Sequence, residues 1–273
     1  MFYGSTFEYG GTDSSTYGLV IADFNINNVE ETPAFSPTVI TDKPANSIHA
    51  IFGKRSYDEA PTFEMEVVSP DEITVANRCT IHKWLISPQG VLTAGYSYHG
   101  WGALKIKSSV ISSYTYHALF TEVDDVYVNG RLVGFRLHGV LDSPYAYGLT
   151  STLEVWGTDG YQTVSISVLS DIGYVYPTME LSVGGLDSGD ALVFKNTTDS
   201  PYRSTILSDA TIGYNYTMDA ERRSLTTTAP TNPFGCFNRI WPRLVPGTNS
   251  LSIKMSSGSY LSISCPSYKM LGL

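Results

Sequence analysis

Residues 116–138 read YHALFTEVDDVYVNGRLVGFRLH, and this stretch decides the class of fold. Two short apolar runs, Tyr116–Thr121 and Arg131–His138, lie on either side of Asn129-Gly130. An Asn-Gly pair between two apolar runs is the strongest short-range signal for a tight β-hairpin turn. The sequence therefore predicts a β-hairpin with its turn at Asn129-Gly130, near the end of the first half of the chain.

Most of the chain has the same character. Thr62–Val68 alternates polar and apolar residues at period two, as a half-buried strand does, and Tyr17–Phe24 is an apolar run bounded by turn residues. Further short strands are expected at Val164–Val168, Met179–Val183, Ala191–Phe194 and Ser250–Met255. A second turn is expected within 183–190. The protein is therefore predicted to be mainly β.

One segment departs from the strand pattern. Ser69 is placed as an N-cap, Pro70 at the first helical position and Glu72 where its carboxylate can reach back to the cap. After them, apolar and small residues recur near one face at a period of 3.6; these are Ile73, Ala76, Thr80, Ile81, Trp84 and Leu85. We expect one amphipathic helix over 70–86, packed on a sheet through Trp84 and ended by the turn residues 87–90.

The length of 273 residues fits one large domain or two smaller ones. A turn at Asp142-Ser143-Pro144-Tyr145 suggests a seam, with one domain over 1–144 and another over 145–273. The first domain holds 9 basic and 16 acidic side chains, net −7, and the second holds 8 and 10, net −2. The second domain reads as strands alone, which is typical of a β-sandwich. Residues 25–61, rich in proline, are expected to form a long irregular excursion.

Composition limits the partners. The net charge is −9, which argues against electrostatic binding of nucleic acid or of an anionic membrane over a broad surface. Only 16% of the residues are charged, while tyrosine occurs 19 times. Tyrosine is an amphipathic residue that suits surfaces covered by a partner. Much of the surface is therefore expected to make protein contacts.

Cysteine usage and segment hydrophobicity indicate a protein that is made and folded in a cytoplasm. Cys79, Cys236 and Cys265 form no Cys-x-x-Cys pair, and we expect them to be reduced, although pairing of Cys236 with Cys265 stays open. The first residues lack the pattern of a secretion signal. No apolar run is long enough to span a bilayer, so no membrane association is expected.

Few residues suggest catalysis. There is no Gly-x-Ser-x-Gly elbow, and the histidines are scattered over positions 49, 82, 99, 117 and 138. His117 and His138 lie in neighbouring predicted strands and, with a carboxylate such as Asp142, have the residue types of a metal site. No ligand spacing supports such a site, so structural roles are favoured.

The remaining motifs are also weak. Gly53-Lys54-Arg55-Ser56 is similar to the end of a phosphate-binding loop but lacks its first glycine, so a solvated turn is favoured. Asp124-Asp125 and Asp187/Asp190 are acidic pairs, yet sequence neighbours rarely face each other across a glycosidic bond. Trp101 is expected to cover the core or enter an interface, rather than to form an exposed ligand platform.

Several segments, taken in their order, resemble one family, the distal tail (Dit) proteins of bacteriophages with long, non-contractile tails. In the first half these are Phe7–Gly10, Ser15–Ile21, Gly53–Arg55, Phe63–Val68 and Ile81–Leu85. They continue with Tyr114–Ala118, Gly130–Phe135, Asp142–Tyr147 and, near the C-terminus, Trp241–Ile253. The resemblance covers nearly the whole chain, although the region of Gly53–Arg55 departs from the tidier form seen in relatives.

The resemblance implies a structural virion protein of the tail tip. Its N-terminal domain, expected to be β-sandwich-like with one helix, would form a hexameric ring that joins the tail tube to the host-adsorption device. Its C-terminal domain would be a galectin-like β-sandwich that projects outward. The implied partners are other copies of the chain, the tail tube protein, and hub, fibre and receptor-binding proteins. DNA would pass through without specific binding. The resemblance implies no catalytic, cofactor-binding or metal-binding residue.

Two other functions compete with this one. A carbohydrate-binding module would stack a sugar on Trp156, Trp241 or a tyrosine, and residues 145–273 alone would retain glycan binding. A polysaccharide hydrolase would use two acidic residues and would release reducing sugar from host cell wall.

Overall fold

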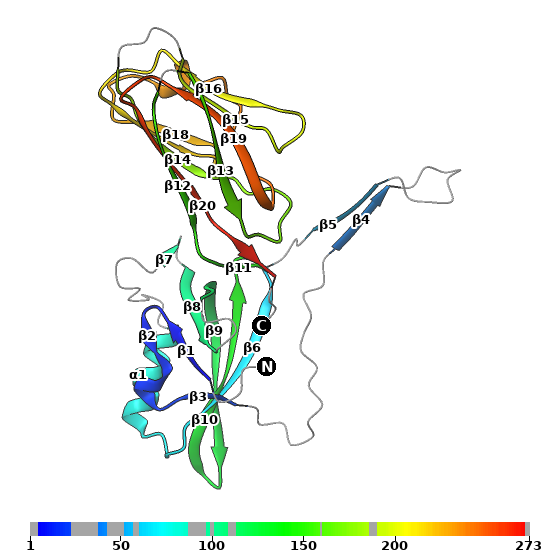
Figure 1. The fold of residues 1–273 in the computed structure, drawn as a ribbon. Coiled ribbons are helices and arrows are strands. Elements are labelled where there is room, and N and C mark those ends of the chain that lie inside the picture. Colours follow the sequence, from blue (N-terminus) through cyan, green and yellow to red (C-terminus); the bar gives the residue numbers. More distant parts are fainter. Residues whose placement is uncertain are drawn as a thin grey trace. The chain divides into compact units, whose positions relative to one another are not determined.

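A computed structural model describes residues 5–22, 38–42, 52–56, 60–86, 97–98, 101–108, 113–158, 160–185 and 190–270. Its contacts divide the chain into two units, Met1–Ala146 with Met270–Leu273, and Tyr147–Lys269. Figure 1 shows that strands dominate both units, with one α-helix in the first. The mainly β fold predicted from the sequence is confirmed.

The N-terminal unit is built on one eight-stranded antiparallel sheet. Its order is β2 (Thr12–Asp13), β1 (Thr6–Tyr9), β8 (Trp101–Lys107), β9 (Tyr116–Val128), β10 (Arg131–Leu141), β6 (Thr62–Val68) and β3 (Val20–Ala22), and β7 (Ser97–Tyr98) pairs with β8. The short helix η1 (Ser14–Tyr17) precedes β3. The expected strand at Tyr17–Phe24 begins later than predicted, at Val20, because Ser14–Tyr17 is helical; its last two residues, Asp23 and Phe24, lie outside the described part.

The predicted hairpin is formed by β9 and β10. Asn129 and Gly130 have φ values of 51° and 78°, the left-handed conformation that a tight hairpin turn requires. The two strands then pair from Arg131–Val128 to Leu141–Ala118, with register shifts near Leu132/Gly134 and His138/Gly139. Asp124 and Asp125 are consecutive residues in the regular part of β9 between these shifts, so they project to opposite faces of the sheet.

The helix α1 (Val75–Ile86) begins later than the predicted residue 70. The backbone of 69–73 bonds to β10 instead, since Ser69 N donates to Val133 O and Ile73 N donates to Leu132 O. The side chain of Thr74 accepts from Asn77 N at 3.2 Å and caps the helix, so the predicted cap at Ser69 is wrong.

The helix packs on the buried face of the sheet, as predicted, through Trp84. The Trp84 and Phe7 rings stack with centroids 5.5 Å apart, and Trp84 Nε1 donates to Tyr9 O at 3.0 Å. Ile81 and Leu85 are also buried, whereas Ala76 and Thr80, predicted to share the buried face, are exposed. The core therefore uses both ends of the predicted apolar face, with Ile73 buried just before the helix, but not its middle.

The proline-rich region contains regular structure. β4 (Thr38–Asp42) and β5 (Phe52–Ser56) form an antiparallel two-stranded sheet. The prediction of an irregular excursion over 25–61 was therefore wrong in this part, and Gly53–Ser56 lies in a strand rather than a turn. Backbone pairing compensates for the scarcity of apolar runs here.

The C-terminal unit consists mainly of two antiparallel sheets. One has the order β12 (Ser151–Trp156), β20 (Tyr260–Cys265), β14 (Thr178–Ser182), β17 (Asn215–Asp219) and β18 (Ser224–Thr227). The other has the order β13 (Tyr161–Val168), β19 (Gly247–Met255), β15 (Asp190–Asn196) and β16 (Ser204–Ser208). The short strands β11 (Ala146–Tyr147) and β21 (Tyr268–Lys269) pair separately, and η2 (Pro233–Gly235) is a single helical turn.

Buried side chains alternate along the strands of both sheets, so each sheet has one buried face. Leu251 and Ile253 on β19 and Leu261 and Ile263 on β20 are fully buried, for example. Two sheets that each bury one face form a sandwich.

A polar junction secures the segment before β19. Asn249 is fully buried, donates to Val245 O at 2.7 Å, and accepts from Asn196 Nδ2 at 2.8 Å. Arg243 makes a bidentate pair with Asp199 at 2.7 and 3.0 Å. Since unsatisfied buried polar groups are costly, this set of bonds fixes the geometry of the segment.

Candidate functional site: the outer face of the N-terminal sheet

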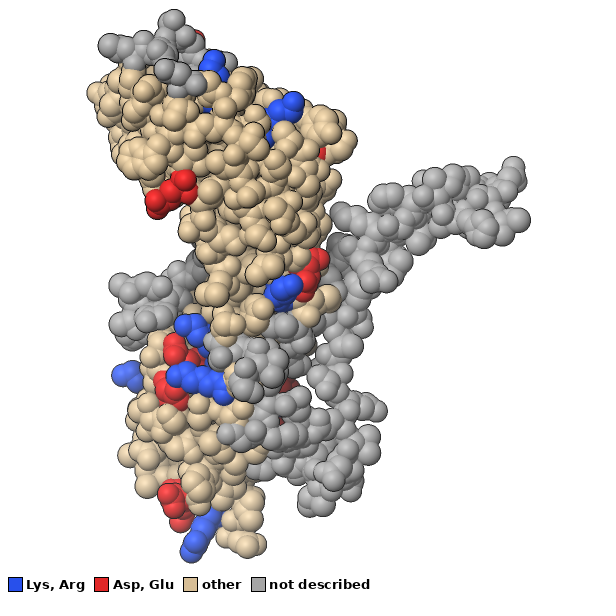
Figure 2. All heavy atoms as spheres, viewed as in Figure 1, with Lys and Arg blue, Asp and Glu red and all other residues tan. Residues whose placement is uncertain are grey.

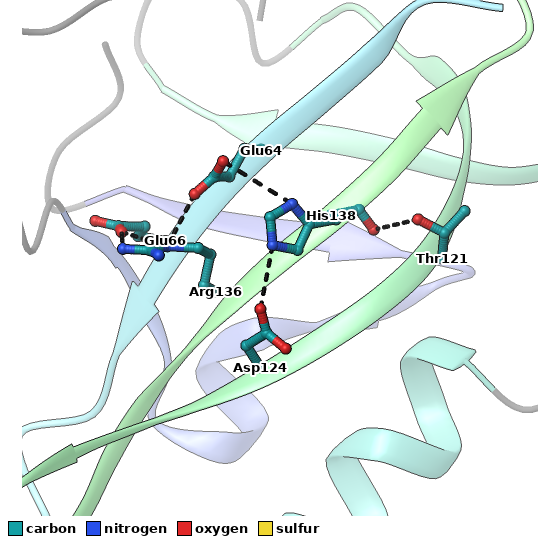
Figure 3. A network of polar contacts seen from close by, with 6 residues as sticks. All are labelled: Glu64, Glu66, Thr121, Asp124, Arg136 and His138. Atoms are coloured by element: carbon teal, nitrogen blue, oxygen red, sulfur yellow. Dashed lines mark hydrogen bonds and ion pairs between the residues drawn. The ribbon is translucent and has the colours of Figure 1, made fainter.

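Charged side chains gather on the face of the N-terminal sheet that is turned away from α1. Glu64 and Glu66 on β6 lie beside Arg136 and His138 on β10, with Asp124 on the adjoining β9 (Figure 3). Arg136 Nε lies 2.8 Å from Glu64 Oε1, and its terminal nitrogen lies 2.7 Å from Glu66 Oε1. The hydrogen bond to Glu66 raises the pKa of the Arg136 guanidinium above its ordinary value.

His138 occupies the middle of this network. Its Nε2 lies 3.3 Å from Asp124 Oδ2 and its Nδ1 lies 3.9 Å from Glu64 Oε2. The hydroxyl of Thr121, in the irregular part of β9, donates to His138 O at 3.3 Å. The network holds more carboxylates than cations, so it can accept a further positive charge from a partner.

A second set of ion pairs lies near the other edge of the same sheet. Lys107 contacts both Asp13 and Glu8, and Lys105 Nζ lies 3.7 Å from Glu8 Oε1. Partial burial raises the pKa of Asp13, but its hydrogen bonds with Lys107 and Ser15 outweigh that effect and lower it overall. Ion pairs exposed to this degree contribute little to the free energy of unfolding. Their main physical effect is to place positive and negative side chains next to each other on this face.

On the opposite face, Asp125 ties α1 to the sheet. Arg78 Nε lies 2.7 Å from Asp125 Oδ2, and His82 Nε2 lies 3.3 Å from Asp125 Oδ1. The Tyr127 hydroxyl donates to the same carboxylate at 3.2 Å. Asp124 and Asp125 therefore serve different faces and do not form a catalytic pair.

The tip of the β9–β10 hairpin is apolar and exposed. Tyr127 is 57% exposed and Val128 is 51% exposed, beside the exposed Asn129-Gly130 turn. A protruding aromatic and a β-branched residue next to charged faces are suited to insertion into another chain. No sequence signal distinguished these residues, because apolar residues in a strand are normally buried.

The structure does not bring the predicted histidines together. His117 Nδ1 lies 2.9 Å from Asp142 Oδ2, while His138 pairs with Asp124, so each imidazole has its own carboxylate. Within the described residues, no cluster of His, Cys, Asp or Glu has a geometry able to hold a metal ion. His49, His99 and Asp187 lie outside the described residues, and the side chain of Asp190 is not described.

The tryptophans differ in their availability to a ligand. Trp156 is 66% exposed, whereas Trp241 is 9% exposed and packs against Phe237 with ring centroids 4.9 Å apart. Trp101 lies in β8, is half-buried, and pairs with Tyr98. Trp156 is therefore available for stacking and Trp241 is not.

A cleft of about 470 Å³ lies in the C-terminal unit. Its walls include Asp209, Thr211, Tyr216, Cys236 and Asn238. Asp209 is the single acidic residue among its lining residues, so this cleft lacks the paired carboxylates of a glycoside hydrolase. Cys79, Cys236 and Cys265 are all free, so Cys236 and Cys265 do not pair.

No helix among the described residues has the length and apolar character needed to cross a bilayer. Figure 2 shows acidic and basic side chains next to each other on the N-terminal unit, while the face it presents of the C-terminal unit carries few charges.

Residues 2–143 match the family described as phage tail protein N-terminal domain. Among solved structures, the crystal structure of the phage SPP1 Dit protein is similar, with a TM-score of 0.60, 14% identity, and coverage of 96% of this chain and 98% of that chain. The baseplate of phage P2, in its activated conformation with Ca, gives a TM-score of 0.49 at 10% identity, over 95% of this chain and 97% of that chain. No curated protein matches the chain by sequence. The resemblance drawn from the sequence is thus confirmed, and the fold is Dit-like.

Proposed function

We propose, from the premise that the chain belongs to the phage tail proteins with this N-terminal domain, that it is a distal tail subunit of the virion. It would form a hexameric ring joining the tail tube to the host-adsorption device, and it would have no enzymatic activity. The observation that carries the proposal is the Dit-like fold over 96% of the chain. The solved relative is described as a paradigm of the hub adsorption apparatus in phages that infect Gram-positive bacteria.

Ring formation requires two different surfaces on each subunit. A ring closes through a heterologous interface, in which one patch of a subunit contacts another patch of the next. The exposed hairpin tip with Tyr127 and Val128 offers an apolar patch, and the outer face around Arg136 and His138 offers a charged one. We assign ring formation to the domain 1–144 for this reason.

The remaining roles follow from the same assignment. Residues 145–273 would form a galectin-like sandwich that projects from the ring and docks fibre or receptor-binding proteins. The N-terminal domain carries a net charge of −7, so a lumen lined by it would repel DNA and let it pass without binding.

A variant of the hairpin tip tests ring formation. Tyr127→Asp places a charge where an apolar contact is proposed, so the wild-type protein should form six-fold rings in negative-stain images and the variant should not. Leu149→Asp is a matched control, since Leu149 is 78% exposed in the C-terminal unit and should leave the rings intact. Rings that persist in the Tyr127 variant would remove the hairpin tip from the interface, and wild-type protein without rings would remove the proposed function.

A second candidate function is glycan binding by the C-terminal unit. It is favoured by one specific observation, the exposure of Trp156 beside Tyr260, with ring centroids 4.8 Å apart. The hydrolase alternative has no comparable support, because Asp209 is alone in its cleft.

A further inference from the structure

The outer face of the five-stranded sheet in the C-terminal unit has an unusual composition. Every second residue of β12, β20, β14, β17 and β18 is turned away from the buried side, and pairing arranges these residues in rows across the sheet. The rows are Trp156–Tyr260–Ser182–Asn215, Glu154–Ser262–Glu180–Thr217–Thr226 and Thr152–Ser264–Thr178–Asp219–Ser224. The face consists almost entirely of hydroxyl, amide and carboxylate side chains.

Carboxylates outnumber cations on this face. Glu154, Glu180 and Asp219 are its ionisable carboxylates, and the five strands, all fully described, contain neither Lys nor Arg. Arg222, between β17 and β18, lies 3.6 Å from Asp219 and balances that one carboxylate, so Glu154 and Glu180 give the middle row its negative charge. Such a face repels phosphate, sulfate and carboxylate groups. It offers many hydrogen-bond acceptors together with hydroxyls that both donate and accept.

The aromatic residue at the end of the face is held firmly although its ring is exposed. The carbonyl of Trp156 accepts from Gln162 Nε2 at 2.6 Å, and the next residue, Gly157, donates to Ser259 O at 2.7 Å. A Cβ on Gly157 would lie 2.1 Å from Ser256 O, so the backbone here packs too closely for any other residue. The backbone that carries the exposed indole is therefore fixed, and the indole packs against the Tyr260 ring with centroids 4.8 Å apart.

The neighbouring polar groups are also ordered. Burial, together with the hydrogen bond to Glu154, raises the pKa of the Tyr260 phenol, so that hydroxyl stays protonated and donates to the carboxylate. Ser182 Oγ donates to Asn215 Oδ1 at 2.8 Å in the same row as Trp156. A ligand lying along this row meets two aromatic rings, Trp156 and Tyr260, and then the hydrogen-bonded polar pair of Ser182 and Asn215.

We propose that this face binds a neutral glycan, with a sugar ring stacked on Trp156 and its hydroxyls bonded to Glu154, Glu180 and Asn215. Sugar C–H groups pack on an indole, and sugar hydroxyls donate to carboxylates and exchange bonds with serine and amide side chains. Charge complementarity favours a ligand that is rich in donors and free of negative charge.

A protein partner fits this face less well. The cores of protein interfaces are apolar and depleted of charge, with several aromatic or aliphatic anchors. Here Trp156 and Tyr260 are the aromatic residues of the face, they lie at one end, and carboxylates occupy the centre. The proposal rests on the second candidate function, glycan binding by the C-terminal unit, and deepens it by naming the class of glycan and the residues that contact it; it does not depend on ring formation.

Glycan binding is tested with the labelled full-length chain on a microarray that carries neutral oligosaccharides, their sialylated and sulfated counterparts, and polylysine. The wild-type chain is expected to be retained by neutral glycans and not by the anionic ones. Trp156→Ala should raise the dissociation constant for the best neutral glycan at least about tenfold, because the stacking surface is lost. Glu180→Gln should raise the same dissociation constant by a smaller factor.

Tyr161→Ala is the matched control, since Tyr161 is also 66% exposed but lies on β13, in the other sheet. It should bind as the wild type does. The proposal is overturned if no neutral glycan is retained, if the Trp156 and Tyr161 variants lose binding equally, or if polylysine or anionic glycans are retained in preference. Ring formation by the Trp156 variant, measured separately, should be unchanged, so failure here is distinct from failure of the hub function.

Discussion

The two units cover the apolar face of a β-sheet in different ways. In the N-terminal unit one helix covers the buried face, and the outer face is patterned with matched acids and bases such as Arg136 and Glu66. In the C-terminal unit each sheet covers the other, and the outer face of the five-stranded sheet carries hydroxyls and carboxylates with no cation on its strands. Alternating charges are suited to docking another protein in register, whereas a face of hydroxyls and carboxylates is suited to an uncharged sugar. The contrast suggests that assembly and ligand binding are divided between the units.

Thiol reactivity should separate the units most strongly. Cys79 on α1 is exposed, whereas Cys265 on β20 is buried, and burial raises the pKa of its thiol to about 12. Alkylation of Cys265 in the native protein should be slower than that of Cys79 by about a thousandfold or more, because it requires opening of the sandwich. Iodoacetamide labelling followed by peptide mass spectrometry measures both rates. Similar rates would mean that the C-terminal sandwich is not the more closed unit.

Loss of the helix anchor should have the next largest effect. Trp84→Ala removes the stack on Phe7 and the bond to Tyr9 O, and should lower the free energy of unfolding of the N-terminal unit by about 3 kcal/mol. Urea unfolding followed by hydrogen exchange of each unit measures the change. The C-terminal unit should keep its stability if the two units fold independently. Trp156→Ala, at an exposed position, is the control and should change stability by less than about 0.5 kcal/mol.

Breaking the outer network should have a moderate effect. Arg136→Ala leaves Glu64 and Glu66 without their shared cation, and should destabilise the N-terminal unit by about 1 kcal/mol, less in high salt. Arg131→Ala is the control, since Arg131 is 71% exposed and its nitrogen lies 3.7 Å from Glu72. That variant should be near neutral by thermal unfolding. Equal effects would show that the network is an ordinary solvated surface.

Acid sensitivity at Asp13 should be the smallest effect. Its pKa lies below the ordinary value of 3.8, so the native state binds this proton less readily than the unfolded state. The resulting stabilisation is present above the unfolded pKa and is lost as pH falls through the folded value. Because the pair with Lys107 is exposed, the loss should be about 0.5 kcal/mol or less between about pH 5 and pH 2. Asp13→Asn should remove this part of the pH dependence in thermal unfolding curves, and an unchanged curve would contradict it.

Local sequence signals predicted the elements whose geometry they control. Asn129-Gly130 adopts the left-handed turn that its residue types favour, and Thr62–Val68 alternates in the structure as it does in the sequence. The start of the helix was mispredicted, since long-range bonds from Ser69 and Ile73 to β10 outweighed a good local cap.

Contacts between strands were beyond the reach of sequence patterns. The register of β9 and β10 decides that His138 meets Asp124 while His117 meets Asp142, and a shift of one residue would exchange the faces. The outer face of the five-stranded sheet has the same origin. Its serines, threonines and glutamates are unremarkable singly, and pairing alone collects them beside Trp156.

The division between assembly and binding is tested most directly by a cryo-electron microscopy reconstruction of the full-length protein in its assembled form. We predict a closed six-fold ring whose subunit contacts lie within residues 1–144 and include the tip of the β9–β10 hairpin, with Trp156 left open to solvent. A ring held together by residues 145–273, or a particle without closed symmetry, would contradict the account.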